Sequence, residues 1–219
     1  MRDDMGPPGG DPQNLLAALD RIRELEAQLD KALFDVGNLR LQMDMFSVTD
    51  TLTGLRNVNG VITALERAAV RSRRSKEPFA LMAVDIPALA EINENHGQRA
   101  HEDAVRHSGA LISACLRRLD TVGRMDEAGF HLVLPMLDKA GVEPVVARIE
   151  DLLARMPIEI DGEEVTLTPV FTIMLNNPHG ASDIQRMVKE LAIARDRPAE
   201  ESPVVIWAKA AVEEPIDRD

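Results

Sequence analysis

The stretch Asp50-Thr51-Leu52-Thr53-Gly54-Leu55-Arg56-Asn57 separates two unlike parts of the 219-residue chain. Before it, apolar residues recur every seven positions, which is typical of a coiled-coil helix. After it, helical and strand patterns alternate as far as residue 208. Such alternation predicts an α/β domain built around one central sheet, and the preceding helix leads directly into that domain.

The segment 14–47 predicts a coiled-coil helix that forms a homodimer. Its seam consists of five a positions and five d positions, namely Leu15, Ile22, Leu29, Val36 and Met43 at a, and Ala18, Leu25, Ala32, Leu39 and Phe46 at d. A narrow seam with a period of 3.5 favours a coiled coil over a single amphipathic helix lying on the domain. The pattern leaves open whether the helix pairs with its own copy or with a related chain.

The remaining elements are predicted from periodicity and turn residues. We expect helices over 57–75, 88–95, 102–118, 138–155 and 182–196, strands over 79–84, 130–134, 165–174 and 203–208, and a hairpin over 158–165. Residues 1–13 hold three prolines and three glycines, so this segment is expected to be disordered. The α/β domain is assigned to residues 48–209, and residues 210–219 form an acidic tail.

Composition restricts the class of partner. The formal net charge is −12 and aromatic residues make up 3% of the chain, which argues against nucleic acid and against an anionic membrane surface. Cys115 is the single cysteine, so an intramolecular disulfide or a cysteine zinc cluster is excluded. No signal peptide or membrane-spanning run is visible, and the sequence predicts a cytoplasmic protein without a cofactor.

Four segments in order resemble the GGDEF family of diguanylate cyclases. They are the entry motif 50–57, the strand 79–86 followed by Ile92-Asn93 and Gly97, the RxxD motif Arg117-Arg118-Leu119-Asp120, and the hairpin segment 124–135. The resemblance implies a nucleotidyl-cyclase-like fold, with a mixed and mostly antiparallel sheet flanked by helices. It covers residues 47–208.

The resemblance also implies which residues hold the catalytic metal ions. Asp85 matches the aspartate that ends the first strand of the family. The signature GGDEF or GGEEF corresponds to Asp126-Glu127-Ala128-Gly129-Phe130, in which both glycines and both acids are replaced. Because Mg²⁺ requires oxygen ligands, this comparison predicts a degenerate signature, no catalytic residues, no bound metal and no cyclase activity. The chain is accordingly predicted not to be an enzyme.

Residues of a nucleotide pocket survive in part. Asn93 matches the asparagine that reads guanine, Glu102 replaces an aspartate, and Arg195 keeps a positive charge where the family has lysine. His101 stands where the family has glycine. We interpret Asp85, Asn93, Glu102 and Arg195 as a vestigial nucleotide pocket.

The RxxD motif implies an inhibitory-type site for cyclic di-GMP. In the family, its arginine grips phosphate and its aspartate accepts from guanine N–H groups, and Arg148 matches a second arginine of that site. The chain is therefore predicted to be an inactive cyclic di-GMP receptor that acts through Arg117, Asp120 and Arg148, together with an unidentified protein partner. The alternatives are a helix ion pair between Arg117 and Asp120 in a nucleotide-independent scaffold and, more remotely, a residual cyclase.

Overall fold

The computed structural model describes residues 21–26, 28–36, 47–125, 129–179, 183–196 and 202–207. The chain divides into two compact units, residues 1–46 and residues 47–219. The expected disordered segment 1–13 and the acidic tail 210–219 lie outside the described residues. Among the described residues, no helix has both the length and the apolar character needed to cross a bilayer.

The first unit is helical over residues 21–26 and 28–36. Its seam residues Ile22, Leu25, Leu29 and Val36 are about half exposed. An apolar stripe that a single chain leaves in water is typical of a helix that pairs with another one. The pairing itself stays a prediction.

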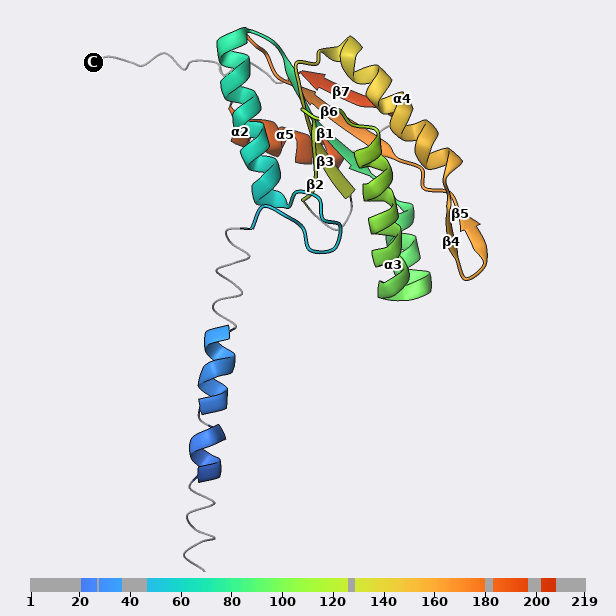
Figure 1. The fold of residues 1–219 in the computed structure, drawn as a ribbon. Helices are drawn as coiled ribbons and strands as arrows, with labels where there is room; N and C mark the ends of the chain where they lie inside the picture. The colour runs from blue at the N-terminus through green and yellow to red at the C-terminus, as the bar shows by residue number, and fades with distance from the viewer. Residues whose placement is uncertain are drawn as a thin grey trace, which may run out of the picture. The chain divides into compact units, whose positions relative to one another are not determined.

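The second unit contains a five-stranded sheet with the order β2-β3-β1-β6-β7, as Figure 1 shows. Its strands are β1 (Phe79–Asp85), β2 (Thr121–Arg124), β3 (Gly129–Pro135), β6 (Val170–Leu175) and β7 (Val204–Trp207). All neighbours are antiparallel except β6 and β7, which are parallel. The predicted mixed, mostly antiparallel sheet is confirmed. A separate hairpin joins β4 (Ile158–Ile160) to β5 (Glu163–Val165).

Helices cover both faces of this sheet. They are α2 (Val58–Ser75), α3 (Ala88–Ala114), α4 (Lys139–Arg155) and α5 (Ile184–Arg195). Side chains alternate along β1, so Met82 packs in one core cluster with residues of α3 and α4, and Leu81 packs in another with residues of α2 and α5. The strand β1 is buried on both faces, which explains its uninterrupted apolar sequence.

Two predicted boundaries are wrong, and one strand is not predicted. The expected helices over 88–95 and 102–118 lie within α3 on either side of Gly97, whose φ of +79° is not helical, but the second of them ends at Ala114 and not at residue 118. The expected strand 165–174 is shorter, because residues 166–169 separate β5 from β6. The strand β2 has only four residues, too few for a recognisable alternation, and the sequence pattern does not predict it. The hairpin turn agrees with the prediction, since Asp161 and Gly162 both have positive φ.

Candidate functional site

The entry motif forms a compact loop that leads into α2 and lies against β2. The Asp50 carboxylate accepts hydrogen bonds from the Thr53 amide at 2.9 Å and from the Thr53 hydroxyl at 2.6 Å. Asn57 caps α2 by accepting from the Gly60 amide at 3.0 Å. The Arg124 amide donates to the Arg56 carbonyl at 2.8 Å. The loop thereby holds the end of β2, from which the Arg124 side chain extends.

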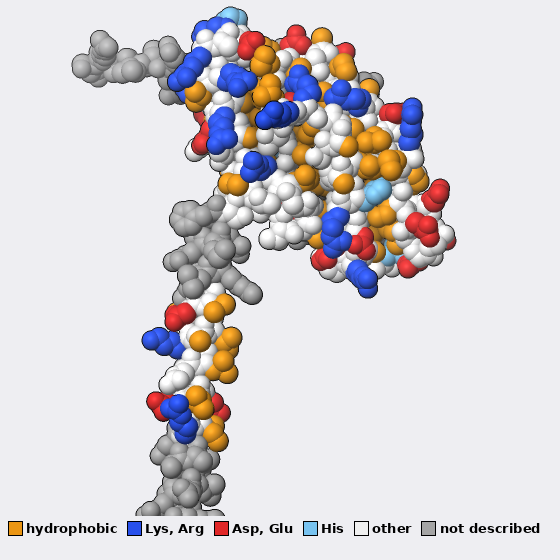
Figure 2. All heavy atoms as spheres, viewed as in Figure 1, with side chains coloured by type: hydrophobic (Ala, Val, Ile, Leu, Met, Phe, Trp, Pro, Cys, Tyr) orange, Lys and Arg blue, Asp and Glu red, His pale blue; other side chains and the backbone are white. Residues whose placement is uncertain are grey.

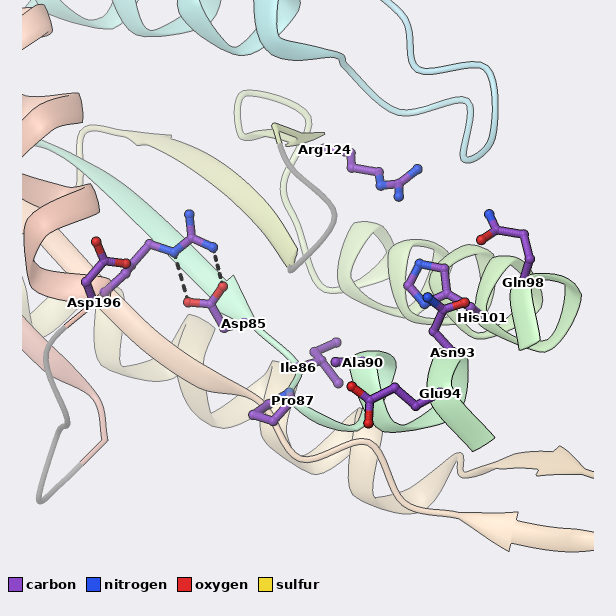
Figure 3. Close-up of a pocket in the computed structure, with 11 residues that line it drawn as sticks. Asp85, Ile86, Pro87, Ala90, Asn93, Glu94, Gln98, His101, Arg124 and Asp196 are labelled. Atoms are coloured by element: carbon purple, nitrogen blue, oxygen red, sulfur yellow. Dashed lines mark hydrogen bonds and ion pairs between the residues drawn. The ribbon is translucent and has the colours of Figure 1, made fainter. Parts of the chain in front are cut away.

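A cavity of about 650 Å³ opens at the end of β1, between α3, β2 and α5 (Figure 3). Its lining residues are Asp85, Ile86, Pro87, Ala90, Asn93, Glu94, Gln98, His101, Arg124, Arg195 and Asp196. This volume is within the range of small-molecule sites. Three residues of the predicted nucleotide pocket, Asp85, Asn93 and Arg195, are therefore brought together.

The fourth predicted pocket residue, Glu102, is not among the cavity-lining residues. Its carboxylate accepts a hydrogen bond from Gln98 at 3.0 Å and forms an ion pair with Arg106 at 3.5 Å. Glu102 lies one turn beyond Gln98 on the same side of α3, and its part in the nucleotide pocket stays a prediction. Gln98 itself lines the cavity, so Glu102 holds the amide of a residue in the cavity wall.

Asp85 forms a two-pronged ion pair with Arg195, drawn as dashed lines in Figure 3. Nε of Arg195 donates to Oδ2 of Asp85 at 3.0 Å, and Nη2 donates to Oδ1. Among the described residues, no group of three or more His, Cys, Asp or Glu side chains is placed to hold a metal ion. In this conformation the described residues do not fit Mg²⁺, because the carboxylate at the strand end is already paired with a guanidinium.

The signature segment is described only at its end. Asp126, Glu127 and Ala128 lie outside the described residues, so their predicted roles stay predictions. Gly129 opens β3 opposite Asp85, and a Cβ at this position would lie 2.2 Å from the Val84 carbonyl oxygen. Phe130 is buried in the sheet core with 1% of its surface exposed. Both described residues of the signature are thus structural parts of the β1–β3 pairing.

The RxxD motif forms a turn after α3 and not a helical turn. Nε and Nη2 of Arg117 donate to the two carboxylate oxygens of Asp120 at 3.1 and 2.9 Å. The Asp120 amide donates back to the Arg117 carbonyl at 2.9 Å. The ion pair between Arg117 and Asp120 therefore exists, but it lies in a turn and not along a helix as the alternative expected.

The two partners differ in exposure. The Asp120 side chain is inaccessible, whereas 47% of the Arg117 side chain is exposed. The hydrogen bonds from Arg117 to Asp120 raise the pKa of Arg117. Burial of the guanidinium lowers this pKa, and the negative charge of Asp120 raises it further. Nη2 of Arg117 also donates to the Pro135 carbonyl at 3.2 Å. Asp120 thus orients Arg117, and much of the guanidinium stays open to solvent.

Arg148 lies beside the same turn. It is exposed on α4, and its carbonyl is 3.6 Å from the Cys115 sulfur, two residues before Arg117. Burial raises the pKa of the Cys115 thiol, and the Arg148 charge partly opposes this shift. The backbone of Arg148 therefore lies beside Cys115 near the end of α3, two positions before Arg117 in the sequence.

Arg71 is a further neighbour of this site that the sequence does not predict. Nη1 of Arg71 is 3.7 Å from the sulfur of Met136, the residue that follows the Pro135 partner of Arg117. Lys and Arg side chains gather over α2 in Figure 2, and Arg67, Arg71 and Arg74 border one depression there. The contact of Arg71 with Met136 at the end of β3 depends on the tertiary fold, because the two residues are 65 positions apart in the sequence.

A mixed, mostly antiparallel sheet flanked by helices, with a cavity at the end of β1, is the α/β class that the sequence predicted. A family model described as "Diguanylate cyclase, GGDEF domain" matches residues 47–198. This match covers more than half of the chain, and the chain belongs to the GGDEF family.

The relatives have low sequence identity to this chain, and the matched residues are a minor part of each relative. Diguanylate cyclase DgcP of Pseudomonas aeruginosa is 25% identical over 122 residues, which are 56% of this chain and 18% of that protein. Response regulator PleD of Caulobacter vibrioides is 22% identical over 173 residues, 79% of this chain and 37% of that protein. This chain therefore spans less than half of the length of either relative.

Solved structures support the fold. The GGDEF domain of FimX from Pseudomonas aeruginosa superposes with a TM-score of 0.65 at 14% identity, covering 74% of this chain and 99% of that one. The coiled coil and GGDEF domain of DgcB from Caulobacter crescentus, solved in complex with c-di-GMP, gives a TM-score of 0.60 at 19% identity, covering 84% and 99%.

These relatives correct one prediction. The replaced acids and glycines of the signature predict that the chain is not an enzyme. Three matching relatives are named diguanylate cyclases, and the matching family model carries the same description. The substitutions in one hairpin are an insufficient ground for placing the chain outside an enzyme family.

Proposed function

We propose that this GGDEF-family chain binds cyclic di-GMP through Arg117, Asp120 and Arg148. The single observation that carries the proposal is the exposed Arg117 guanidinium, which a buried Asp120 holds in a fixed orientation. A guanidinium oriented in this way is suited to phosphate, because fewer of its rotamers are lost when the ligand binds.

Two other helices contribute further arginines near the turn. Arg148 lies beside the turn on α4, and Arg71 reaches the end of β3 beside Pro135. Because cyclic di-GMP carries two phosphates, several arginines from different elements match its charge. The complex of DgcB with c-di-GMP supports the same class of ligand.

The inaccessible Asp120 carboxylate has a positioning role in the ligand-free conformation. Direct contact between Asp120 and a guanine edge requires Arg117 to release one carboxylate oxygen. The proposal therefore gives Arg117 the first contact with phosphate, and Asp120 reaches the base only after this rearrangement.

Replacing Arg117 with alanine tests the proposal by calorimetric titration with cyclic di-GMP. We expect the wild-type chain to bind at micromolar or lower concentration, and Arg117→Ala to weaken binding by about 10- to 100-fold, since charge-assisted hydrogen bonds contribute about 1.5–3 kcal/mol. Arg118→Ala removes the same charge from the neighbouring exposed position and should change the affinity less than about threefold. Absence of binding to the wild-type chain would refute the receptor function.

A homodimer through residues 14–47 is the second part of the proposal. Leu25 occupies a d position and is 49% exposed in the single chain. We expect Leu25→Asp to weaken dimerisation at least about a hundredfold, because two apolar contacts are lost and two carboxylates face each other. Sedimentation over a concentration series measures this change. Phe34→Asp, at an f position outside the seam, is the matched control, and equal effects of both variants would contradict the coiled coil.

Synthesis of cyclic di-GMP is the second candidate function, favoured by the relatives named diguanylate cyclases. Incubation of the chain with GTP and Mg²⁺, followed by chromatography of the nucleotides, tests it directly. Product formation that is lost in Asp85→Asn supports a cyclase, and the same assay without any product leaves ligand binding as the function.

A further inference from the structure

His101 on α3 lines the cavity at the end of β1, a site separate from the Arg117 turn. Only 7% of its surface is exposed, and it lies in the cavity wall together with Asn93 and Gln98. Its Nδ1 lies 3.0 Å from the Leu89 carbonyl oxygen. Because a carbonyl can only accept, Nδ1 carries the hydrogen, and Nε2 of the neutral ring presents a lone pair.

Within the part of the chain that the structure describes, His101 forms its hydrogen bond with the Leu89 carbonyl alone. Because Nδ1 is bound to the Leu89 carbonyl and the residue lines the cavity, Nε2 is the ring nitrogen that a ligand in the cavity could use. In Figure 3 the ring lies beside the Asn93 amide, on the α3 side of the cavity, while Arg124 extends from above. The cavity thus has a hydrogen-bond acceptor and an amide at one end, and guanidinium groups toward the other.

We propose that His101 determines base specificity in this cavity, by accepting a hydrogen bond from the N1–H of a guanine nucleotide. Guanine presents a donor at N1, whereas adenine presents a lone pair there, which would face the lone pair of Nε2. Asn93 lies beside His101 and can pair with the adjacent edge of the base. A wrong base leaves the buried acceptor without a hydrogen bond or places a second lone pair against it. Either effect lets the site discriminate effectively between guanine and adenine. This inference concerns a different site from the cyclic di-GMP proposal and does not depend on it.

A purely structural role for His101 makes different predictions. Its bond to the Leu89 carbonyl joins the two halves of α3 across the kink at Gly97. Asparagine places its amide nitrogen near the position of Nδ1, so His101→Asn keeps this bond and removes the acceptor at Nε2. Glutamine places its amide near the position of Nε2, so His101→Gln removes the bond and keeps a group that can accept or donate.

The experiment is a calorimetric titration with guanosine 5′-monophosphate and with its O6-methyl derivative, which lacks the N1–H. A monophosphate cannot undergo the cyclase reaction, so binding is measured without turnover. We expect the wild-type chain to prefer guanosine monophosphate about tenfold, which corresponds to one hydrogen bond. His101→Asn should bind both ligands equally, with a melting temperature close to that of the wild type. His101→Gln should melt earlier and keep a smaller preference.

Two results would overturn the proposal. One is a wild-type chain that does not bind guanosine monophosphate at millimolar concentration, or does not distinguish it from the O6-methyl derivative. The other is a preference that persists in full in His101→Asn. If His101→Asn does not fold, His101→Leu decides, because leucine removes both ring nitrogens, and a preference that persists in full in that variant contradicts the role of Nε2.

Discussion

Phe130→Ala is expected to lower the free energy of unfolding by about 3–5 kcal/mol, because it removes a large side chain from the packed core. Phe130 is 1% exposed and pairs with Val84 across β1 and with Arg124 across β2. Its ring also lies 3.1 Å from the place that a Cβ on Gly109 of α3 would take. The cavity left by alanine therefore adjoins the sheet and α3 at once. Urea denaturation followed by circular dichroism measures the change.

Phe34→Ala is the matched control for this prediction. Phe34 is 70% exposed in the helix of the first unit, so its truncation removes little buried surface. We expect a change of less than about 0.5 kcal/mol in the unfolding of the second unit. A similar loss of stability in both variants would contradict the assignment of Phe130 to the core.

Gly129→Ala is expected to cost about 1–3 kcal/mol or more, because the added methyl group overlaps the backbone of β1. The new Cβ would lie 2.2 Å from the Val84 carbonyl oxygen and 3.0 Å from the Asp85 Cα. Backbone atoms in the centre of a sheet cannot move aside as a side chain can, so β3 must shift away from β1. The melting temperature and the urea midpoint should both fall.

Gly141→Ala provides the comparison. The nearest atom to a Cβ at Gly141 is Cδ2 of Leu137, the far end of a flexible side chain, and the position lies in the first turn of α4. Alanine also favours the helix over glycine, so the change should be near neutral or slightly stabilising. Equal destabilisation by both substitutions would argue against a steric role for Gly129.

The steric role of Gly129 bears on the signature hairpin. The family resemblance expects an acid at this position, and Gly129→Glu would introduce the same Cβ overlap as alanine. Its carboxylate would also lie near Asp85, the partner of Gly129 in the β1–β3 register. Restoring the family residue at position 129 alone is therefore expected to destabilise the sheet, which makes this substitution a poor way to test for catalysis.

Local sequence determined those features whose causes lie within a few residues. The apolar run 79–84 predicted a buried strand, the Asp161-Gly162 pair predicted the hairpin turn, and the pattern over 57–75 predicted α2, which Asn57 caps. Each follows from side-chain periodicity, from a permitted positive φ, or from a cap. The family resemblance, carried by short local motifs, identified Asp85, Asn93 and Arg195 of the cavity.

Only the tertiary structure decided how the polar side chains pair. Asp85 meets Arg195 across 110 residues of sequence, so a carboxylate that the resemblance treats as vestigial holds a specific ion pair. The family resemblance predicts Glu102 in the nucleotide pocket, whereas in the structure Glu102 binds Gln98 and Arg106 on its own helix. A charged side chain pairs with an opposite charge that folding brings within reach. The order of residues in the sequence does not specify the distance between two such side chains. Periodicity therefore determined the sheet and the helices, whereas the sites depended on which long side chains meet after packing.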